Sequence, residues 1–432
     1  MELMTALPLQ FNMDTLGAVF AVLTLIIFAA AGIFATDYMK DKDYRRSFAV
    51  FFLLAMAAEL GLCAASNLVT FYMCYELLTI LSVPLVIHDR TKEAKMAALK
   101  YLFFSLFGAY TALFGIYNLS RFADSLGFKM GGSVSAASWD GNGTILLITA
   151  MALIVGFGVK AGMWPMHAWL PDAHPIAPAP ASAVLSACIV KAGVLGIIRS
   201  LWYVMGVQDL AGTWVQTAFA TLSLLTVLMG SALAFAEPVL KKRLAYSTVS
   251  QVSYILFGLS VSFAGEGAVT GAILHVYAHG FIKAALFLTA GAIIHHVGVT
   301  RVEEMRGIGT KMPFTMICYT ICSLGLIGIP PTGGFVSKWY LATGAMATRI
   351  PVFAYLGPVI LLVSALLTAG YLLQLVILAF FPGAEYRSAH PDEKREEPGL
   401  AMTLPIATLT LLSVILGIYP DPLIELVSRI FI

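Results

Sequence analysis

The most regular feature of the chain is a succession of apolar stretches of about 20 residues or more, the length a helix needs to cross roughly 30 Å of hydrocarbon. Twelve such stretches are separated by polar linkers that are mostly short. They cover residues 14–36, 48–66, 67–88, 96–119, 144–164, 176–200, 213–236, 244–263, 268–296, 313–347, 352–381 and 400–428. The pattern predicts an all-α polytopic membrane protein with about twelve transmembrane helices.

Proline and glycine interrupt two of these stretches. Stretch 144–164 runs into five prolines between Pro165 and Pro180, and stretch 313–347 contains Pro330-Pro331 followed by Gly333-Gly334. Both residue types disfavour a continuous helix, so each stretch is predicted to be a discontinuous helix.

The two broken helices occupy matching places in the chain. Each is the fourth helix of a five-helix block, and an odd number of helices forces a second copy to be inverted in the membrane. We therefore expect two inverted five-helix repeats, at 48–204 and 205–381. A leading helix and cytoplasmic loop precede them at 1–47, and a charged loop and last helix follow at 382–432.

Composition agrees with a membrane protein. Hydrophobic residues make up 59% of the chain and charged residues 12%, and the net charge is only +2. No basic face remains to bind nucleic acid. The five cysteines lie inside apolar stretches without a CxxC pattern, which favours buried small side chains over a metal or iron–sulfur site. No basic residue precedes the first stretch, so we expect it to be a membrane helix rather than a cleaved signal.

The basic residues are distributed unevenly between alternate loops. With the N-terminus outside, 16 of the 26 lysines and arginines face the cytoplasm, while five face the opposite side. The positive-inside rule therefore predicts that both termini lie outside the cytoplasm, in the inner membrane of a bacterium or archaeon. The cytoplasmic set is Lys40, Lys42, Arg45, Arg46, Arg90, Lys92, Lys95, Lys241, Lys242, Arg243, Arg301, Arg306, Lys311, Arg387, Lys394 and Arg395, and the outer set is Arg121, Lys129, Arg199, Arg349 and Arg429.

Lys100 lies just inside the end of stretch 96–119, which leaves four basic residues deeper within the predicted membrane segments: Lys160, Lys191, Lys283 and Lys338. A lysine near the bilayer centre costs about 2.5 to 3.5 kcal/mol on insertion scales, so these four are candidates for a functional site. The alternative for Lys160 and Lys191 is that their side chains extend to an interface.

Two acidic residues also lie within apolar stretches. Glu76 is close to the middle of stretch 67–88, and we expect it to pair with Lys160, because the broken helix of the same block should supply its partner. Glu59 is a candidate for access or support. Its alternative is an outward-leaning polar residue on a protein-facing stripe.

His275, His279 and Lys283 recur at intervals of four residues, so they share one helix face over about 12 Å. This spacing favours a proton relay. The alternatives are haem ligation and metal binding. Two histidines so placed on one helix cannot be opposed ligands of one haem, however, and no nearby pattern supplies a third metal ligand.

Three polar residues surround Trp169 after the first break: His167, Asp172 and His174. Proline-rich backbone within a membrane is tolerated only inside protein or beside a hydrated cavity. These residues are predicted either to cap freed backbone groups or to take protons from the aqueous side. The Pro-Asp-Ala-His-Pro order favours Asp172 as a helix cap.

Several motifs resemble one known family. The run GVKAGMWPMHAWLPDAHPIAPAPASAVLSACIVKAGVLGIIRS is similar to the signature of the antiporter-like subunits of respiratory complex I, Mrp-type sodium/proton antiporters and energy-converting membrane-bound hydrogenases. FYMCYELLTILSVP, KRLAYSTVSQVSYILFGL and GIPPTGGFVSKWYLATG agree with the same family. The resemblance covers nearly the whole chain.

The resemblance implies a proton or sodium pathway. In that family's terms, Glu76 and Lys160 are the ion pair of the first half-channel, and Lys191 is a central relay. His279 and Lys283 bridge to the second unit, which ends at Lys338. The chain begins at the family's third helix and ends without the long lateral helix of the distal complex I subunit, so its parent complex stays open.

The expected function is ion translocation within a redox-driven or antiport complex. The sequence shows no cysteine cluster, no GxGxxG after a strand and no soluble domain for a nucleotide. We therefore expect no cofactor in this chain. Iron–sulfur, flavin, nickel–iron or quinone would sit in partner subunits, which include sister antiporter-like subunits and a soluble redox module. The alternatives are a stand-alone cation/proton antiporter and the energising subunit of an inorganic-carbon uptake system.

Overall fold

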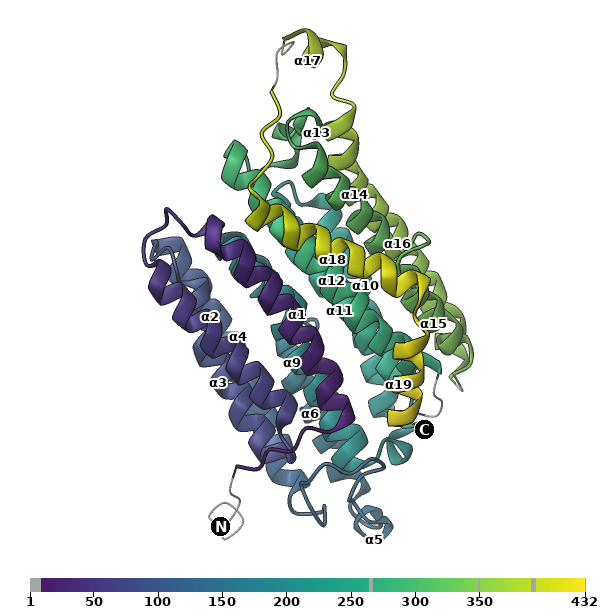
Figure 1. The fold of residues 1–432 in the computed structure, drawn as a ribbon. Helices are drawn as coiled ribbons and strands as arrows, with labels where there is room; N and C mark the ends of the chain where they lie inside the picture. The colour runs from purple at the N-terminus through teal and green to yellow at the C-terminus, as the bar shows by residue number, and fades with distance from the viewer. Residues whose placement is uncertain (1–8, 264–266, 349, 390–393, 432) are drawn as a thin grey trace.

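The computed structural model describes residues 9–263, 267–348, 350–389 and 394–431. In these ranges, the segments that cross the bundle are helices. β pairing in the described residues is limited to isolated bridges, such as that of Phe11 with Ala65. Figure 1 shows the helices packed side by side in one elongated bundle, with α1 to α4 at one side and α14 to α16 at the other. The all-α prediction is confirmed.

Eleven helices are long and apolar enough to cross a membrane among the described residues, and a broken pair, α14 and α15, supplies the further predicted crossing. The first half comprises α1 (Thr15–Tyr38), α2 (Arg45–Ala64), α3 (Leu68–Val86), α4 (Lys92–Leu119), α5 (Ala136–Trp139), α6 (Gly143–Lys160), α7 (Leu170–Ile176), α8 (Ala179–Val184), η2 (Leu185–Ile189), α9 (Val190–Ser200), η3 (Leu201–Met205) and η4 (Val207–Leu210). The second comprises α10 (Trp214–Ala236), α11 (Leu240–Val261), α12 (Gly267–Val297), η5 (Val302–Glu304), α13 (Ile308–Lys311), α14 (Pro313–Ile327), α15 (Gly333–Met346), α16 (Pro351–Phe380), α17 (Ala384–Ala389), α18 (Leu400–Ile418) and α19 (Asp421–Phe431).

Both predicted helix breaks are present. α6 ends at Lys160, and a stretch without regular helix leads to the short helix α7. Trp169 is fully buried at this break and donates its indole N–H to the Val159 carbonyl at 3.1 Å, which holds the two pieces together. α14 likewise ends at Ile327, before Gly328 with a positive φ of 99°, and α15 starts at Gly333. The breaks leave helix ends and free carbonyls inside the bundle.

The last predicted crossing needs a correction. Stretch 400–428 is not one helix, because α18 ends at Ile418 before Pro420 and a separate helix, α19, begins at Asp421. The apolar residues of α19 lie toward the bundle while Glu425 and Arg429 are exposed. α1 begins on the same side of the bundle as α19 (Figure 1). The placement of both termini outside the cytoplasm stays a prediction.

The core of the bundle consists of three spans. Every residue of the span Ala179–Met205 is buried, and buried residues make up most of α11 and α12 but only a minority of α16. The central spans are therefore enclosed by protein, and the outer helices α2, α3, α4 and α16 present apolar side chains to their surroundings. This division places the buried polar residues away from lipid.

Candidate functional site

Lys160 is the last residue of α6, and its side chain is fully buried. Its Nζ donates to Thr79 Oγ1 at 2.5 Å and lies 4.2 Å from the centre of the Tyr75 ring. The predicted ion pair with Glu76 is not formed in this structure, where a Glu76 carboxylate oxygen is buried without a hydrogen-bond partner. Lys160 therefore binds the Thr79 hydroxyl of α3, and the Glu76 carboxylate lies about one turn earlier on the same helix.

Lys191 lies just after a π-helical turn, η2, in the most buried span. Its Nζ donates to the Ser186 carbonyl at 2.7 Å and lies 2.6 Å from His279 Nδ1 on α12. A π turn widens the helix and disturbs the usual backbone hydrogen bonds, and such turns are frequent at functional sites. Here the turn supplies the Ser186 carbonyl to the lysine. The contact with His279 joins the first half of the chain to the second.

The three residues of α12 share one buried face, as their spacing predicts. Each contacts a different helix. His279 meets Lys191 on α9, Lys283 donates to Ser247 Oγ on α11 at 2.7 Å, and His275 Nδ1 lies 2.9 Å from Ser337 Oγ on α15. α12 thus connects the two broken-helix regions.

Lys338 reaches back from α15 to the end of the preceding half-helix. Its Nζ donates to the carbonyls of Leu326 at 2.6 Å and Ile327 at 3.1 Å, and it lies 4.9 Å from the centre of the Tyr254 ring. These carbonyls belong to the C-terminal end of α14, where the helix dipole favours a cation. The break between α14 and α15 therefore creates the site for this lysine.

None of the four membrane lysines forms an ion pair within 4.0 Å in the described part of the chain, where the ion pairs are Lys100–Asp172, Arg199–Asp14 and Lys242–Glu237. Their acceptors are instead hydroxyls, carbonyls and a histidine nitrogen. A lysine can donate to such neutral acceptors whether it is charged or neutral. The arrangement therefore suits groups that gain and lose protons.

The polar residues after the first break have separate positions. His174 is fully buried on α7, its ring lies 4.8 Å from that of Phe287 on α12, and both ring nitrogens lack a hydrogen-bond partner. Lys283 Nζ lies 5.9 Å from the centre of the same Phe287 ring. His167 is only half-buried, in the loop before α7. His174, and not His167, therefore faces the row of lysines.

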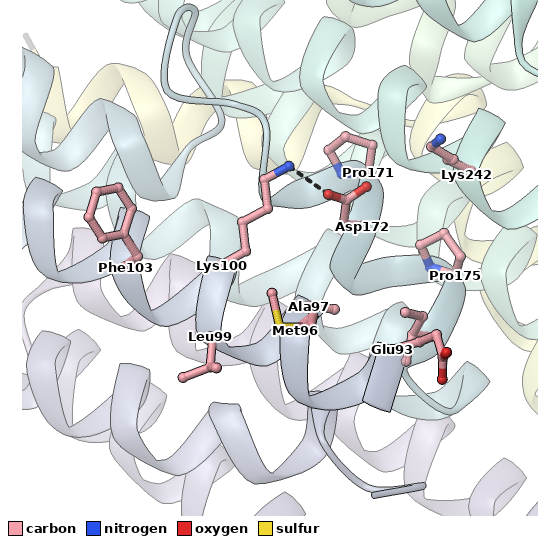
Figure 2. Close-up of a pocket in the computed structure, with 11 residues that line it drawn as sticks. Glu93, Met96, Ala97, Leu99, Lys100, Phe103, Pro171, Asp172, Pro175 and Lys242 are labelled. Carbon is pink, nitrogen blue, oxygen red and sulfur yellow. Dashed lines mark hydrogen bonds and ion pairs between the residues drawn. The ribbon is translucent and has the colours of Figure 1, made fainter. Parts of the chain in front are cut away.

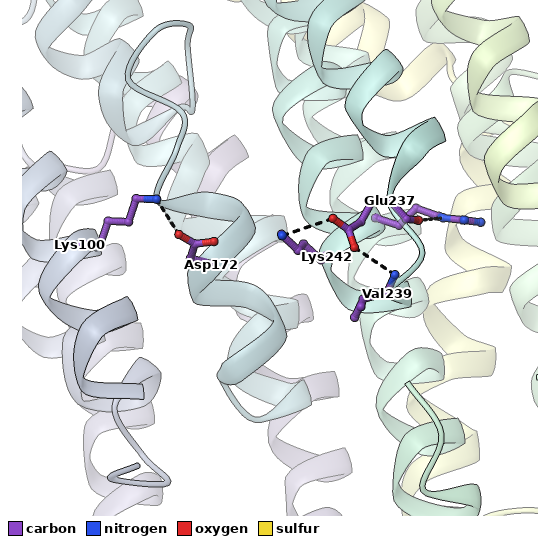
Figure 3. Close-up of polar contacts among 6 residues, drawn as sticks. Lys100, Asp172, Glu237, Val239 and Lys242 are labelled. Carbon is purple, nitrogen blue, oxygen red and sulfur yellow. Dashed lines mark hydrogen bonds and ion pairs between the residues drawn. The ribbon is translucent and has the colours of Figure 1, made fainter. Parts of the chain in front are cut away.

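Asp172 does not cap α7, so that prediction is wrong. The N-cap is Trp169, without a side-chain cap hydrogen bond. Asp172 instead forms an ion pair with Lys100 of α4 (Figures 2 and 3). The two charged atoms are 2.6 Å apart, and both side chains are about 40% exposed. The pair lies in a pocket of about 700 Å³ between α4 and α7, mostly lined by apolar side chains. Lys242 at the same pocket pairs with Glu237 at 3.3 Å (Figure 3).

Three basic residues counted above on the two aqueous sides are buried. Lys241 donates to the Ala177 carbonyl at 2.6 Å, and Arg243 donates to the Tyr371 carbonyl at 2.8 Å. Arg199 is fully buried and binds Asp14 through two hydrogen bonds of 2.5 Å. Arg199 lies eight residues after Lys191 on the same helix face, a spacing that could have indicated its burial. Lys241 and Arg243 carry no such signal.

A bundle with two broken helices around buried lysines and histidines defines a polytopic membrane protein of ion-translocator architecture. The chain belongs to the transmembrane family of NADH:quinone oxidoreductases and Mrp antiporters, whose pattern matches residues 65–368. The family expected from the motifs is confirmed.

Curated relatives extend this match along the chain. It is 32% identical over 427 residues to NADH-quinone oxidoreductase subunit N of Desulforudis audaxviator, covering 96% of this chain and 83% of the relative. It is 29% identical to hydrogenase-4 component B of Escherichia coli, covering 93% of this chain and 61% of that protein. It is 31% identical to Na(+)/H(+) antiporter subunit A1 of Staphylococcus aureus, covering 94% of this chain and 52% of that protein.

Two solved complexes contain chains of the same fold. One is the membrane-bound sulfane sulfur reductase, an archaeal respiratory membrane complex, with a TM-score of 0.86, 23% identity and coverage of 98% of this chain and 83% of that chain. The other is the Mrp complex from Dietzia sp. DQ12-45-1b, with a TM-score of 0.83, 22% identity and coverage of 97% and 83%.

Proposed function

We propose that this chain is the ion-translocating membrane subunit of a larger complex and that it moves protons along Lys160, Lys191, His279, Lys283 and Lys338. The observation that carries the proposal is the 2.6 Å contact between Lys191 Nζ and His279 Nδ1, which links the two halves of the bundle. The names of its relatives, which include a NADH-quinone oxidoreductase subunit and a sodium/proton antiporter subunit, support this function. The ring centres of His275 and His279 are 6.0 Å apart, and His275 contacts Ser337, the residue before Lys338. His275 therefore lies between His279 and Lys338 in the proposed path.

The proposed mechanism is electrostatic and begins at Lys160. When the Glu76 carboxylate approaches the ammonium it stabilises the charged form of Lys160, and when it withdraws the proton is released toward Lys191. One unit of pKa corresponds to about 1.4 kcal/mol, and one charge crossing 100 mV to about 2.3 kcal/mol. A shift of a few units in the pKa of a desolvated lysine is therefore large enough to drive a proton.

The remaining side chains near the breaks would supply access. His174 faces the lysines from α7 and would deliver protons toward Lys191 and Lys283, while His167 and the Asp172–Lys100 pair would support the break from its exposed side. Sodium is the alternative ion, because one relative is named as a sodium/proton antiporter subunit.

The chain would work with partner subunits. Its relatives and structural neighbours include subunits of multi-subunit membrane complexes. We propose sister antiporter-like subunits in the membrane and a soluble redox module that holds any iron–sulfur, flavin, nickel–iron or quinone group, with no cofactor in this chain. The proposed location is the inner membrane, with both termini outside the cytoplasm.

The test is proton uptake by the complex reconstituted in vesicles. Lys191→Ala removes a proton carrier of the axis, and Glu76→Ala removes the carboxylate that sets the protonation of Lys160. Each should lower coupled uptake by roughly tenfold or more, the change that one pKa unit makes in a protonation equilibrium, while the complex still assembles. Lys129→Ala is the matched control, since Lys129 is exposed outside the bundle. Wild-type coupling in both the Lys191 and the Glu76 variants would rule out the proposed axis.

A further inference from the structure

Glu59 lies in the middle of the buried face of α2. Its exposed fraction is 2%, and it shares that face with Phe52, Ala55 and Leu62, while the opposite face of the helix is exposed. The side chain therefore points into the bundle rather than outward. A carboxyl group at this depth is costly unless it is neutral or close to a cation.

The carboxyl group is not engaged by the surrounding protein. Its Oε2 is buried without a hydrogen-bond partner, and Glu59 belongs to none of the ion pairs among the described residues. Buried polar atoms without partners are rare in native proteins and call for a specific explanation. An acid that takes up and releases a proton, with water beside it, is such an explanation.

Lys160 and Lys191 are not joined directly. The hydrogen bonds of Lys160 end on α3, and those of Lys191 end on η2 and α12. The buried face of α2 that carries Glu59 packs against α3, whose Tyr75 and Thr79 accept hydrogen bonds from Lys160. It also packs against α1, which contacts η2, where Ser186 accepts the hydrogen bond of Lys191. Glu59 therefore points toward the region between the first two lysines of the proposed axis.

The other titratable groups near Glu59 hold their protons more tightly. They are the thiols of Cys63 on α2 and Cys188 on η2 and the phenol of Tyr101 on α4, whose ordinary pKa values lie well above that of a carboxyl group. α3 adds Glu76 and Tyr75 near Lys160, and α1 adds Asp14, which is already bound to Arg199. The carboxyl group of Glu59 is thus the one acid placed to exchange protons with both lysines.

We propose that Glu59 carries the proton between Lys160 and Lys191, an inference that rests on the proposed function. The Lys160 ammonium gives its proton to the Glu59 carboxylate, directly or through water, leaving a neutral amine and a neutral carboxylic acid. The acid then passes the proton to the neutral amine of Lys191 and becomes a carboxylate again. Charge and protons balance at each step, and a new Lys191 ammonium forms next to His279.

The first test is proton uptake by the complete complex in vesicles. Glu59→Gln keeps the shape of the side chain but cannot carry a proton, so it should lower coupled uptake about as much as Lys191→Ala. Glu425→Gln, at an exposed position of α19, is the matched control. Wild-type uptake in Glu59→Gln together with loss in Lys191→Ala would overturn the role of Glu59 and leave the axis standing. Wild-type uptake in both variants would overturn the axis itself.

The second test follows the proton on Glu59 and does not depend on the glutamine variant assembling. Infrared difference spectra of the wild-type complex, recorded between resting and energised states, should contain a carboxylic acid band that shifts in Glu59→Asp. Glu59→Asp should also retain part of the uptake, because it keeps an exchangeable acid. A spectrum unchanged by Glu59→Asp would overturn the proposal, since a purely structural glutamate would not change its protonation during turnover.

Discussion

Arg199 illustrates how a charge is stabilised deep in this bundle. Its guanidinium is fully buried, binds Asp14 through two hydrogen bonds of 2.5 Å, and lies 4.5 Å and 4.7 Å from the centres of the Phe128 and Tyr203 rings. Asp14 also caps α1 by accepting a hydrogen bond from the Gly17 N–H at 2.8 Å. One carboxylate therefore fixes the start of α1 to the end of α9.

Asp14→Asn should separate these two roles, because asparagine is as good a helix cap as aspartate but cannot neutralise Arg199. We expect a loss of about 1.5 to 3 kcal/mol of stability, the range for hydrogen bonds to charged groups. Thermal unfolding of the purified protein in detergent measures it. Asp140→Asn, in an exposed loop, is the control, and an equal effect of the two changes would refute the role of the pair.

The same pair predicts a pH dependence. Burial raises the pKa of Asp14, but the hydrogen bond and the charge of Arg199 more than offset it, so the pKa lies below its ordinary value. The stabilisation is therefore complete above the unfolded-state pKa of about 4 and is lost as the pH falls through the lower folded-state pKa. The stability difference between wild type and Asp14→Asn should shrink in that acidic range.

At the scale of single residues, the sequence identifies the charged groups but not their partners. All four membrane lysines are buried or partly buried, as insertion cost predicts. Rotation of α3 about its own axis decides whether Glu76 or Thr79 is the acceptor of Lys160. The hydropathy pattern does not predict this rotation. Asp172 likewise has a partner 72 residues earlier, at Lys100, whereas local turn chemistry suggests a cap.

At the scale of helices, close backbone contact holds α6 in place. A Cβ added to Gly156 would collide with the backbone of Ala112 on α4. Small residues let membrane helices approach this closely. Gly156 lies one turn before Lys160, so the contact with α4 also fixes the position of that lysine.

Gly156→Ala should therefore push α6 away from α4. Overpacking typically costs about 1 to 3 kcal/mol, and the displacement should also weaken coupled proton uptake by moving Lys160 from Thr79. Gly143→Ala is a matched control in the same helix, because its added Cβ would meet no atom within 4 Å. Gly156→Ala should unfold at a lower temperature and take up fewer protons in vesicles than Gly143→Ala. Equal unfolding temperatures and equal uptake in the two variants would contradict the packing argument.

The helix breaks could be predicted from sequence, and the π turn could not. Proline and glycine remove hydrogen bonds or helical preference wherever they occur, so they mark the ends of α6 and α14. The π turn Leu185–Ile189 has an ordinary helix-forming composition. It lies directly before Lys191, whose contact with His279 is a tertiary contact that no local pattern records.

At the scale of the whole molecule, the basic loops predict the orientation. Most lysines and arginines gather at one end of the bundle even after Lys241 and Arg243 are removed from the loop count as buried residues. The rule tolerates these two because it depends on the number of lysines and arginines summed over the loops, whereas burial depends on individual contacts. The inverted relation of the two five-helix blocks stays a prediction.

Membrane-impermeant thiol reagents can test the orientation. The five native cysteines are all buried, so the background should be low. Asp140→Cys should react from outside intact cells, and Lys92→Cys should react only after the cytoplasmic face is opened. Both side chains are exposed in the structure. The reverse labelling pattern would place the termini in the cytoplasm.

The complete burial of the span Ala179–Met205 has a consequence for its relation to the bilayer. A helix that meets no lipid experiences no hydrophobic mismatch of its own, so changes in bilayer thickness must be absorbed by tilt of the outer helices such as α16. The dielectric surroundings of Lys191 are then set by protein rather than by lipid. Coupling at this lysine should be insulated from the membrane's lipid composition, although the chain as a whole is embedded in it.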